Sequence, residues 1–215
     1  MTEIGGKYQV GDEQEIGENY SMTNLIIFDK DQTLVDSLCG ERFIQSPTDQ
    51  AILPGAAEAV QSFYERGFRI AIASNQGGVE ARKKTLESAI EEMRFCLFLF
   101  PVIETGLIAP NYSGESAWEI TQTTAKEISG DFGSFRKPGP GMLNYLMKLY
   151  QSTPSKTWFI GDRPEDEQAA ESAGTQFIAA DIVRARYLPG FSELQVNVEQ
   201  LEFLEPQLKG VYRWE

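Results

Sequence analysis

Residues 25–33 read LIIFDKDQT, and this stretch decides the fold. Four apolar residues in a row are typical of a strand that is buried on both faces, as in a parallel sheet. The run ends at Asp29, and Asp31 follows two positions later. Because residues two apart on a strand point to the same side, we expect both carboxylates to converge beyond the carboxyl end of the strand. This is the edge at which open α/β sheets bind ligands.

Short apolar runs alternate with longer amphipathic segments along the rest of the chain. This pattern predicts further strands at residues 68–73, 97–103, 157–160 and 176–179, and helices at residues 54–66, 79–94, 139–149, 165–173 and 198–208. Such alternation is the signature of repeated βαβ units. The sequence therefore predicts a three-layer, doubly wound α/β fold with a mainly parallel, Rossmann-like sheet.

Two segments fall outside the alternation. Residues 1–21 are rich in Gly, Glu and Gln, and we expect a loosely held N-terminal extension to one domain, residues 22–215. Residues 105–134 hold several Gly and Pro breakers, and we expect a lid or specificity loop there. A short helix with Trp118, Ala125 and Ile128 on one face is one interpretation of this stretch; a surface excursion without a chemical role is the other.

Composition narrows the possible chemistry. The 215 residues include 19 basic and 32 acidic ones, a net charge of −13, two cysteines and no histidine. The lack of histidine excludes Ser-His-Asp and Cys-His catalysis and the usual zinc sets, so catalysis must use carboxylates, lysine or a metal. The acidic charge makes nucleic acid an unfavourable partner. No apolar run approaches the roughly 20 residues of a membrane span, and no secretory signal is evident, so we expect a cytoplasmic protein.

A second acidic motif follows the predicted strand at residues 157–160. Both strand ends open on the same edge of a parallel sheet, so Asp162 and Asp166 are expected to join Asp29 in a cluster of hard oxygen ligands that suits Mg²⁺. Carboxylates at close range repel each other unless a cation intervenes or one keeps its proton. In the alternative interpretation, these aspartates only cap turns and helices.

Two further motifs suit an anion. Ser74 and Asn75 follow the predicted strand at residues 68–73 and precede two glycines, whose backbone N–H groups can approach a phosphate closely. Arg136 and Lys137 precede a predicted helix, where a lysine can act as a point charge against phosphoryl oxygens. Taken alone, each motif is more often a turn or a solvated charged pair.

Together, in this order, the four motifs resemble the haloacid dehalogenase superfamily of aspartate-nucleophile phosphohydrolases. The residues that carry the resemblance are Asp29-x-Asp31-x-Thr33, Ser74, Lys137 and Gly161-Asp162-x-x-x-Asp166. The fuller strings at residues 74–76 and 136–142 are most similar to the class IIIA branch, which holds heptose bisphosphate phosphatases, histidinol phosphatases and polynucleotide 3′-phosphatases. The resemblance implies the same α/β core, with a minimal cap or none because the intervals between motifs are short.

The resemblance also implies a reaction and roles for residues. Asp29 would be the nucleophile that forms an aspartyl-phosphate, and Asp31 the general acid and then the base. Ser74, Asn75 and Lys137 would hold phosphoryl oxygens.

Substrate contacts and the metal site follow from the same resemblance. Thr33 and Arg136 would contact the substrate. Mg²⁺ would be held by Asp29, by Asp31 through its backbone carbonyl, by Asp162 and, at or just behind the first shell of ligands, by Asp166. The implied function is a Mg²⁺-dependent phosphomonoester hydrolase acting on a small phosphorylated metabolite.

The sequence departs from the family pattern at two places. The residue between Asp31 and Thr33 is commonly glycine in the superfamily, and here it is Gln32. Sugar-phosphate members of the branch often carry a zinc loop of Cys and His ligands, whereas residues 101–105 read PVIET.

Two alternative functions stay open at this level. A polynucleotide 3′-phosphatase is compatible with the branch but is disfavoured by the acidic charge. A non-enzymatic phosphoacceptor similar to a receiver domain would also combine acidic residues, Mg²⁺, a hydroxyl and a lysine on a doubly wound sheet. Receivers, however, place the acceptor aspartate after a later strand. The sequence leaves the oligomeric state undefined.

Overall fold

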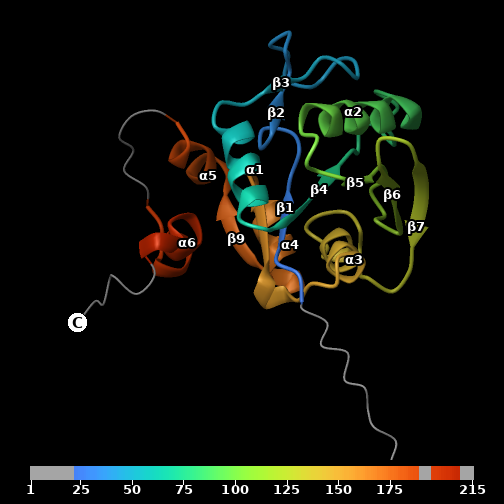
Figure 1. Ribbon diagram of the computed structural model, residues 1–215. Helices are drawn as coiled ribbons and strands as arrows, with labels where there is room; N and C mark the ends of the chain where they lie inside the picture. Colours follow the sequence, from blue (N-terminus) through green and yellow to red (C-terminus); the bar gives the residue numbers. More distant parts are fainter. Residues whose placement is uncertain (1–21, 189–194, 209–215) are drawn as a thin grey trace, which may run out of the picture.

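The computed structural model describes residues 22–188 and 195–208, so the predicted extension at residues 1–21 lies outside the described residues (Figure 1). A seven-stranded sheet in the order β7-β6-β5-β4-β1-β8-β9 forms the centre of the fold. Its strands are β1 (Leu25–Phe28), β4 (Arg69–Asn75), β5 (Thr105–Ala109), β6 (Ser116–Ile120), β7 (Ala125–Ser129), β8 (Thr157–Gly161) and β9 (Gln176–Ala179). Strands β5, β4, β1, β8 and β9 run parallel, and β6 and β7 run antiparallel at one edge. The prediction of a mainly parallel sheet is confirmed.

The register of the sheet brings the polar motifs to one edge. Phe28 at the end of β1 pairs with Ile72 of β4 and with Ile160 of β8. β1 ends at Phe28 and β8 ends one residue after Ile160, whereas β4 continues to Asn75, and all three carboxyl ends lie at the same edge of the sheet. Apolar residues hold this centre in place, because Ile26, Ile27 and the residues that flank them in β1 are buried on both faces of the sheet.

Helices cover both faces. The helices are α1 (Ala56–Glu65), α2 (Leu86–Leu99), α3 (Gly141–Leu149), α4 (Pro164–Ala173), α5 (Ala180–Arg186) and α6 (Val198–Leu204), with 3₁₀ turns η1 (Pro154–Lys156) and η2 (Pro206–Leu208). One core contains buried residues of α1, α2, α5 and α6, and the other contains those of α3 and α4. Alternate residues of β1 face the two cores, with Ile26 in the first and Ile27 in the second, as the two-residue period of a strand requires. The three-layer prediction is therefore confirmed.

The amphipathic pattern of the helices explains their docking. In α1 the buried residues Ala56, Ala59, Val60 and Phe63 form one stripe. Phe63 stacks on Phe203 of α6 with ring centroids 5.1 Å apart. Fully burying a large apolar side chain of this kind contributes roughly 1.5–3 kcal/mol. The α5 helix, which the sequence pattern did not reveal, lies between β9 and the start of α6 in the chain.

The predicted boundaries around α2 are wrong. Residues 79–85 form turns, and the helix begins only after Thr85, whose side chain accepts a hydrogen bond of 3.1 Å from the backbone of Ser88. The predicted strand at residues 97–103 is instead the last turn of this helix followed by a turn. The apolar run suggested a strand because Phe98, which is 68% exposed, lies on the outer face of the helix.

The stretch at residues 105–134 is mostly part of the main sheet. It contains β5, β6 and β7, so the predicted short helix is wrong: Trp118 lies on β6, and Ala125 and Ile128 lie on β7. Gly106 obscured the β5 pattern. A Cβ at this glycine would lie 2.3 Å from the sulfur of Met93, so the strand needs a residue without a side chain where α2 packs.

A small hairpin stands at the end of the sheet that carries the polar motifs. Its strands β2 (Val35–Asp36) and β3 (Ala51–Ile52) pair antiparallel, and residues 37–50 form the loop between them. Figure 1 shows the hairpin next to α2, and Gln50 of the loop donates a 2.9 Å hydrogen bond to the carbonyl of Glu92 in that helix. Across residues 22–188 and 195–208, no helix combines the length and apolar character that crossing a bilayer requires.

Candidate active site

Asp29 lies where β1 ends, in a buried position. It is 6% exposed, and its backbone N–H donates to the carbonyl of Ile160 at 2.8 Å. Its carboxylate Oδ1 accepts a 2.6 Å hydrogen bond from the ammonium group of Lys137. Lys137 is itself 4% exposed and also donates to the carbonyl of Ala73 at 2.9 Å. The nucleophile expected from sequence and the expected phosphate-binding lysine are therefore in direct contact.

Three aspartates meet at this edge of the sheet. Asp29, Asp162 and Asp166 each place a carboxylate oxygen within 4.8 Å of the other two. Like charges this close repel, and hard oxygen donors at such spacing fit a small divalent cation such as Mg²⁺. The donor set of this site therefore fits the metal that the resemblance implies.

Asp166 has two structural tasks besides its place in the cluster. Its Oδ2 accepts the backbone N–H groups of Asp162 and Arg163 at 3.1 Å each, at the beginning of α4, and its Oδ1 lies 2.7 Å from the ammonium of Lys137. Asp166 thus caps the beginning of α4, as in the alternative interpretation, and also belongs to the acidic cluster. Gly161 makes this possible, because a Cβ there would lie 2.4 Å from Asp166 Oδ2.

Electrostatics raise the proton affinity of Asp29. Burial raises its pKa to about 7, Lys137 opposes this shift, and the charges of Asp166 and Asp31 add to it. Burial likewise raises the pKa of Asp162, and Asp166 contributes in the same direction. Burial is therefore the main obstacle to ionisation of Asp29, repulsion from the neighbouring carboxylates adds to it, and a bound cation would offset both.

Asp31 lies in the pocket, but its carboxylate belongs to a different set of contacts from the three clustered aspartates. Its Oδ1 lies 2.5 Å from the ammonium of Lys30, and its Oδ2 accepts a 2.9 Å hydrogen bond from the side chain of Gln76. Partial burial raises the pKa of Asp31, but the charge and hydrogen bond of Lys30, with smaller contributions from Lys84 and Gln76, outweigh it and lower the pKa. The side chain of Asp31 is therefore engaged away from the three clustered aspartates, and the contribution of its backbone carbonyl to the metal site stays a prediction.

The two predicted phosphate ligands after β4 differ in their surroundings. The Ser74 hydroxyl is 1% exposed, lines the pocket and accepts a 3.1 Å hydrogen bond from Gln76. The Asn75 amide is engaged with the backbone of Lys137, donating to its carbonyl at 2.9 Å and accepting from its N–H at 3.0 Å. Asn75 therefore ties the loop that holds Lys137 to β4. Asn75 also lines the pocket, so the predicted contact of its side chain with a phosphate stays a prediction.

Thr33 and Gln32 shape the turn after the first motif. Thr33 is 1% exposed and is not among the residues that line the pocket; its hydroxyl lies 3.5 Å from Asp162 Oδ1. The predicted substrate contact of Thr33 is therefore wrong, and the residue supports Asp162 instead. Gln32 adopts a φ of +63°, in the region that favours glycine. Its carbonyl accepts a 2.5 Å hydrogen bond from Arg184 of α5, which helps to hold this conformation.

Of the three clustered aspartates, Asp29 and Asp166 line a pocket of about 600 Å³, and Asp162 is not among its lining residues. Six of its lining residues are basic and six are acidic, although the whole chain has 19 basic and 32 acidic residues, so basic side chains are concentrated here. Arg136 lies on the pocket wall with its guanidinium 5.0 Å from the ring centre of Tyr112. Its Nη1 is buried and has no hydrogen-bond partner in the described part of the chain, and contact of Arg136 with the substrate stays a prediction.

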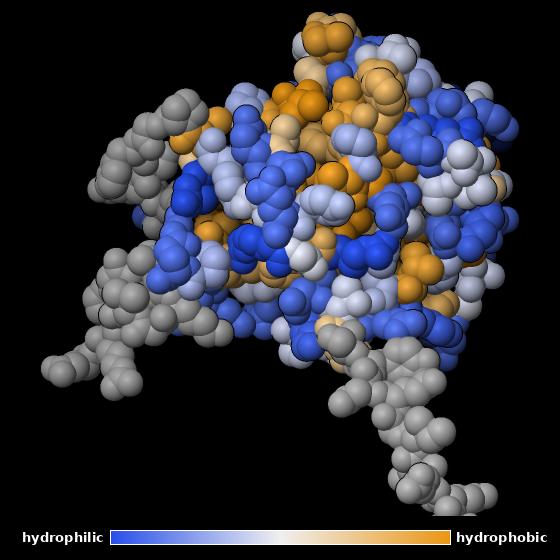
Figure 2. All heavy atoms as spheres, viewed as in Figure 1, coloured by the Kyte–Doolittle hydropathy of each residue, from blue (hydrophilic) through white to orange (hydrophobic). Residues whose placement is uncertain are grey.

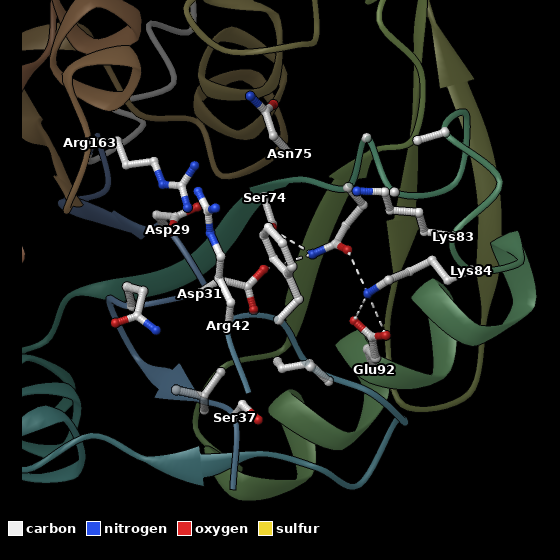
Figure 3. Close-up of a pocket in the computed structure, with 18 of the residues that line it drawn as sticks. Asp29, Asp31, Ser37, Arg42, Ser74, Asn75, Lys83, Lys84, Glu92 and Arg163 are labelled. Carbon is white, nitrogen blue, oxygen red and sulfur yellow. Dashed lines mark hydrogen bonds and ion pairs between the residues drawn. The ribbon is translucent and has the colours of Figure 1, made fainter. Parts of the chain in front are cut away.

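The loop of the hairpin contributes residues that the sequence motifs did not reveal. Arg42 and Phe43 line the pocket, and Figure 3 shows the Arg42 side chain extending toward Asp29 and Asp31 alongside Arg163. Phe43 is 54% exposed, and Leu38 of the same loop is 67% exposed. In Figure 2 apolar side chains gather on the part of the surface where this hairpin stands in Figure 1. An Arg-Phe pair in a loop carries no periodic signal, so sequence patterns could not identify it.

Comparison with known proteins places this geometry among phosphatases. A family model described as Polynucleotide kinase 3 phosphatase matches residues 24–188. The D-glycero-beta-D-manno-heptose-1,7-bisphosphate 7-phosphatase of Pseudomonas putida is 28% identical over 153 residues, which cover 71% of this chain and 79% of that protein. The phosphoglycolate phosphatase of the same organism is 24% identical over 193 residues, covering 74% of this chain and 69% of that protein.

Two solved structures share the fold. A crystal structure of a HAD-like phosphatase from Mesorhizobium loti superposes with a TM-score of 0.60 at 17% identity and covers 99% of this chain and 93% of that one. The D,D-heptose 1,7-bisphosphate phosphatase from B. bronchiseptica, complexed with magnesium and phosphate, superposes with a TM-score of 0.57 at 21% identity. That match covers 87% of this chain and 99% of the other.

Proposed function

Because the chain belongs to the Polynucleotide kinase 3 phosphatase family, within the haloacid dehalogenase superfamily, it is a phosphatase, and we propose that it hydrolyses phosphomonoesters of small sugars with Mg²⁺ through an aspartyl-phosphate on Asp29. The observation that carries the proposal is the buried carboxylate of Asp29, in contact with Lys137 and within 4.8 Å of Asp162 and Asp166 at the pocket. The heptose bisphosphate phosphatases among the relatives support a sugar phosphate as substrate.

The first step transfers the phosphoryl group to the protein. Asp29 Oδ1 is held by Lys137, and its Oδ2 receives no hydrogen bond from the described residues, so Oδ2 is the oxygen that attacks phosphorus. As the new O–P bond forms, the P–O bond to the sugar breaks, and Asp31 donates its proton to the leaving oxygen. Ser74 and Lys137 hold the phosphoryl oxygens, over which the negative charge spreads. The charge of the bound phosphate raises the pKa of Asp31, which favours the protonated form that this step requires.

The second step releases phosphate. Asp31, now a carboxylate, takes a proton from a water molecule whose oxygen attacks phosphorus, and the bond to Asp29 breaks to regenerate the free carboxylate. Asp29, Asp162 and Asp166 would hold Mg²⁺ beside the phosphoryl group. When bound, this ion neutralises carboxylate and phosphoryl charge, so that the anionic nucleophile can approach an anionic ester.

The test uses an aryl phosphate and a panel of sugar phosphates, with Mg²⁺ or with EDTA. We expect turnover that requires Mg²⁺, and its loss in Asp29→Asn. Asp181→Asn, an exposed aspartate on α5, is the matched control and should keep wild-type turnover. The proposal fails if wild-type protein shows no turnover with Mg²⁺, or if Asp29→Asn is as active as wild type.

A polynucleotide 3′-phosphatase is the second candidate, and one observation favours it. Phe43 and Tyr112, which are 54% and 55% exposed, both line the pocket, and aromatic side chains of this kind can stack on bases. The net charge of −13 opposes it. Hydrolysis of a short 3′-phosphorylated oligonucleotide faster than of any sugar phosphate would select this candidate, and absence of binding at low salt would remove it.

A further inference from the structure

We propose that Lys30 and Gln76 are positioning residues that hold the two carboxylate oxygens of Asp31, so that this group faces the leaving oxygen of the substrate. The inference rests on the proposed function, which gives Asp31 the proton transfers. The resemblance implies no role for either residue. Lys30 lies between the two aspartates of the first motif, and Gln76 lies two residues after Ser74.

Lys30 is charged where packing alone would favour an apolar residue. It is among the largest fully buried side chains of the described residues, at 0% exposure, and its neighbours include the buried thiol of Cys96. Burying an ammonium group costs several kcal/mol unless the group is paired. Its partner is Asp31 Oδ1 at 2.5 Å. The contact to Asp31 therefore explains a lysine that the hydrophobic core does not require.

Gln76 holds the other oxygen of the same carboxylate. Its side chain is 4% exposed, and its Nε2 donates to Asp31 Oδ2 at 2.9 Å and to Ser74 Oγ at 3.1 Å. Its backbone N–H donates to the carbonyl of Ala109 in β5 at 2.8 Å, which fixes the residue to the sheet. Asp31 is thus held from two sides by groups on two different elements.

A buried ion pair sets the orientation of the Gln76 amide. Lys84 lies 3.4 Å from Gln76 Oε1 and pairs with Glu92 at 2.6 and 2.7 Å; Glu92 is 1% exposed on α2 (Figure 3). An ammonium group only donates hydrogen bonds, so the amide oxygen must face Lys84. The amide nitrogen is then the atom that faces Asp31. The contacts from Glu92 through Lys84 to Gln76 therefore connect the Asp31 carboxylate to the helix α2.

This support matters because the Asp31 side chain is 39% exposed at the pocket. Without contacts to both of its oxygens, the Asp31 carboxyl group can rotate, and its proton then no longer points at the leaving oxygen of the substrate. Misplacement of an acid or base in this way reduces the rate without weakening substrate binding.

The test compares two substrates in Lys30→Met and Gln76→Met, which keep the side-chain length and remove the donors. Alkyl phosphates have poor leaving groups and depend on a general acid, whereas p-nitrophenyl phosphate does not. We expect kcat/KM for the alkyl phosphate to fall about a hundredfold and that for the aryl phosphate less than about threefold. Lys84→Met, which removes the donor that faces the Gln76 amide oxygen and also the partner of Glu92, should show the same selectivity with a smaller loss.

Controls separate positioning from folding and from the proposed function. Gln61→Met, at an exposed position on α1, should match wild type with both substrates, and unfolding temperature and binding of inorganic phosphate report whether each variant keeps its fold. If Lys30→Met does not fold, Gln76→Met and Lys84→Met decide the matter. Equal losses on both substrates, or no loss, in folded variants overturn the inference. Absence of Mg²⁺-dependent turnover by wild type overturns the proposed function instead.

Discussion

At the scale of single residues, the electrostatics of Asp29 connect folding with catalysis. The carboxylate is buried beside Asp166 and near Asp31, and Lys137 supplies the opposing charge. A nucleophile must be ionised to attack, yet burial favours its protonated form. Ionised Asp29 therefore costs free energy in the metal-free site, and a bound cation lowers this cost.

This conflict predicts a pH dependence of stability in metal-free protein. Folded Asp29 binds its proton up to about pH 7, whereas an unfolded aspartate releases it near 3.8. The folded state thus binds more protons between these values, and its stability falls as pH rises through this window. Between pH 6 and 8 we expect a decrease of about 1.4 kcal/mol in the free energy of unfolding.

Chemical denaturation in EDTA at several pH values measures this effect. The chain has no histidine, so few other groups titrate between pH 6 and 8. In Asp29→Asn the decrease should disappear. An unchanged pH dependence in this variant would show that another group is responsible.

Residue positions along the chain predicted the site better than they predicted side-chain contacts. Asp29, Ser74 and Asp162 were identified because each follows a buried strand, and parallel strands end at one edge. The engagement of Asn75 with Lys137 and the burial of Lys30 depend on side-chain rotation. That rotation is set by neighbours from other elements, which a single sequence does not place.

At the scale of elements, the junction of β8 and α4 holds the acidic cluster in place. Gly161 leaves room for Asp166, so a methyl group at this position must displace the carboxylate. We expect Gly161→Ala to weaken Mg²⁺ binding and to reduce turnover at least tenfold. A tenfold reduction corresponds to an increase of about 1.4 kcal/mol in the activation free energy. Titration of Mg²⁺ against turnover measures both effects.

Gly67→Ala provides the matched control for this substitution. Gly67 has a φ of +83°, and a Cβ there would meet no atom within 4 Å, so alanine strains the backbone far from the cluster. We expect lower stability with unchanged Mg²⁺ dependence. If both variants lose Mg²⁺ affinity alike, the packing of Gly161 on Asp166 is not the cause.

The loop at residues 37–50 depends on Asp49. Its carboxylate accepts backbone hydrogen bonds from Gln45 and Cys39, at 2.9 and 2.8 Å, and one of 3.1 Å from the Ser37 hydroxyl. The backbone hydrogen bond from Gln45 is the largest of the effects that lower the pKa of Asp49 to about 2, so these contacts hold at neutral pH. The same loop carries Arg42 and Phe43 at the pocket.

Replacement of Asp49 should therefore weaken substrate binding more than it slows the chemical step. In Asp49→Ala we expect KM for the best sugar phosphate to rise severalfold with little change in kcat, because the loop loses its fixed shape while Asp29 keeps its contacts. Steady-state kinetics measure the split. A fall in kcat with constant KM would contradict this role of the loop.

The prediction of helices and strands failed where apolar residues lie on both the buried and the exposed face of a helix. The apolar residues 95–99 belong to α2, and its outer residues there are as apolar as its buried ones, so the helical period is hidden. β1 and β9 were predicted with their observed boundaries because a short apolar run between polar residues has one simple explanation.

At the scale of the whole molecule, cation binding should stabilise the fold. A ligand that binds only the folded state at a hundred times its dissociation constant contributes about 2.7 kcal/mol. We expect Mg²⁺ to raise the unfolding temperature of wild type and to have little effect on Asp162→Asn. Because the net charge of −13 also attracts cations non-specifically, NaCl at equal ionic strength and Asp181→Asn are the controls. An equal rise in Asp162→Asn would locate the ion elsewhere.

Architecture explains why an acidic protein can bind a phosphate ester. Asn75 of β4 ties the loop that carries Lys137 to the Asp29 edge of the sheet, and six basic side chains line the pocket there. Six acidic side chains line the same pocket, so the acidic excess of the whole molecule is balanced there. Composition alone could predict the total charge but not this distribution, which depends on loops from four separate parts of the chain.

Chemical trapping of the phosphorylated residue tests the central claim most directly. Borohydride reduces an aspartyl-phosphate to homoserine, so protein quenched during turnover of its best substrate, reduced and digested, can be read by peptide mass spectrometry. We predict homoserine at Asp29, dependent on both Mg²⁺ and substrate. Homoserine at another aspartate, or none at any position during measurable turnover, would contradict the account.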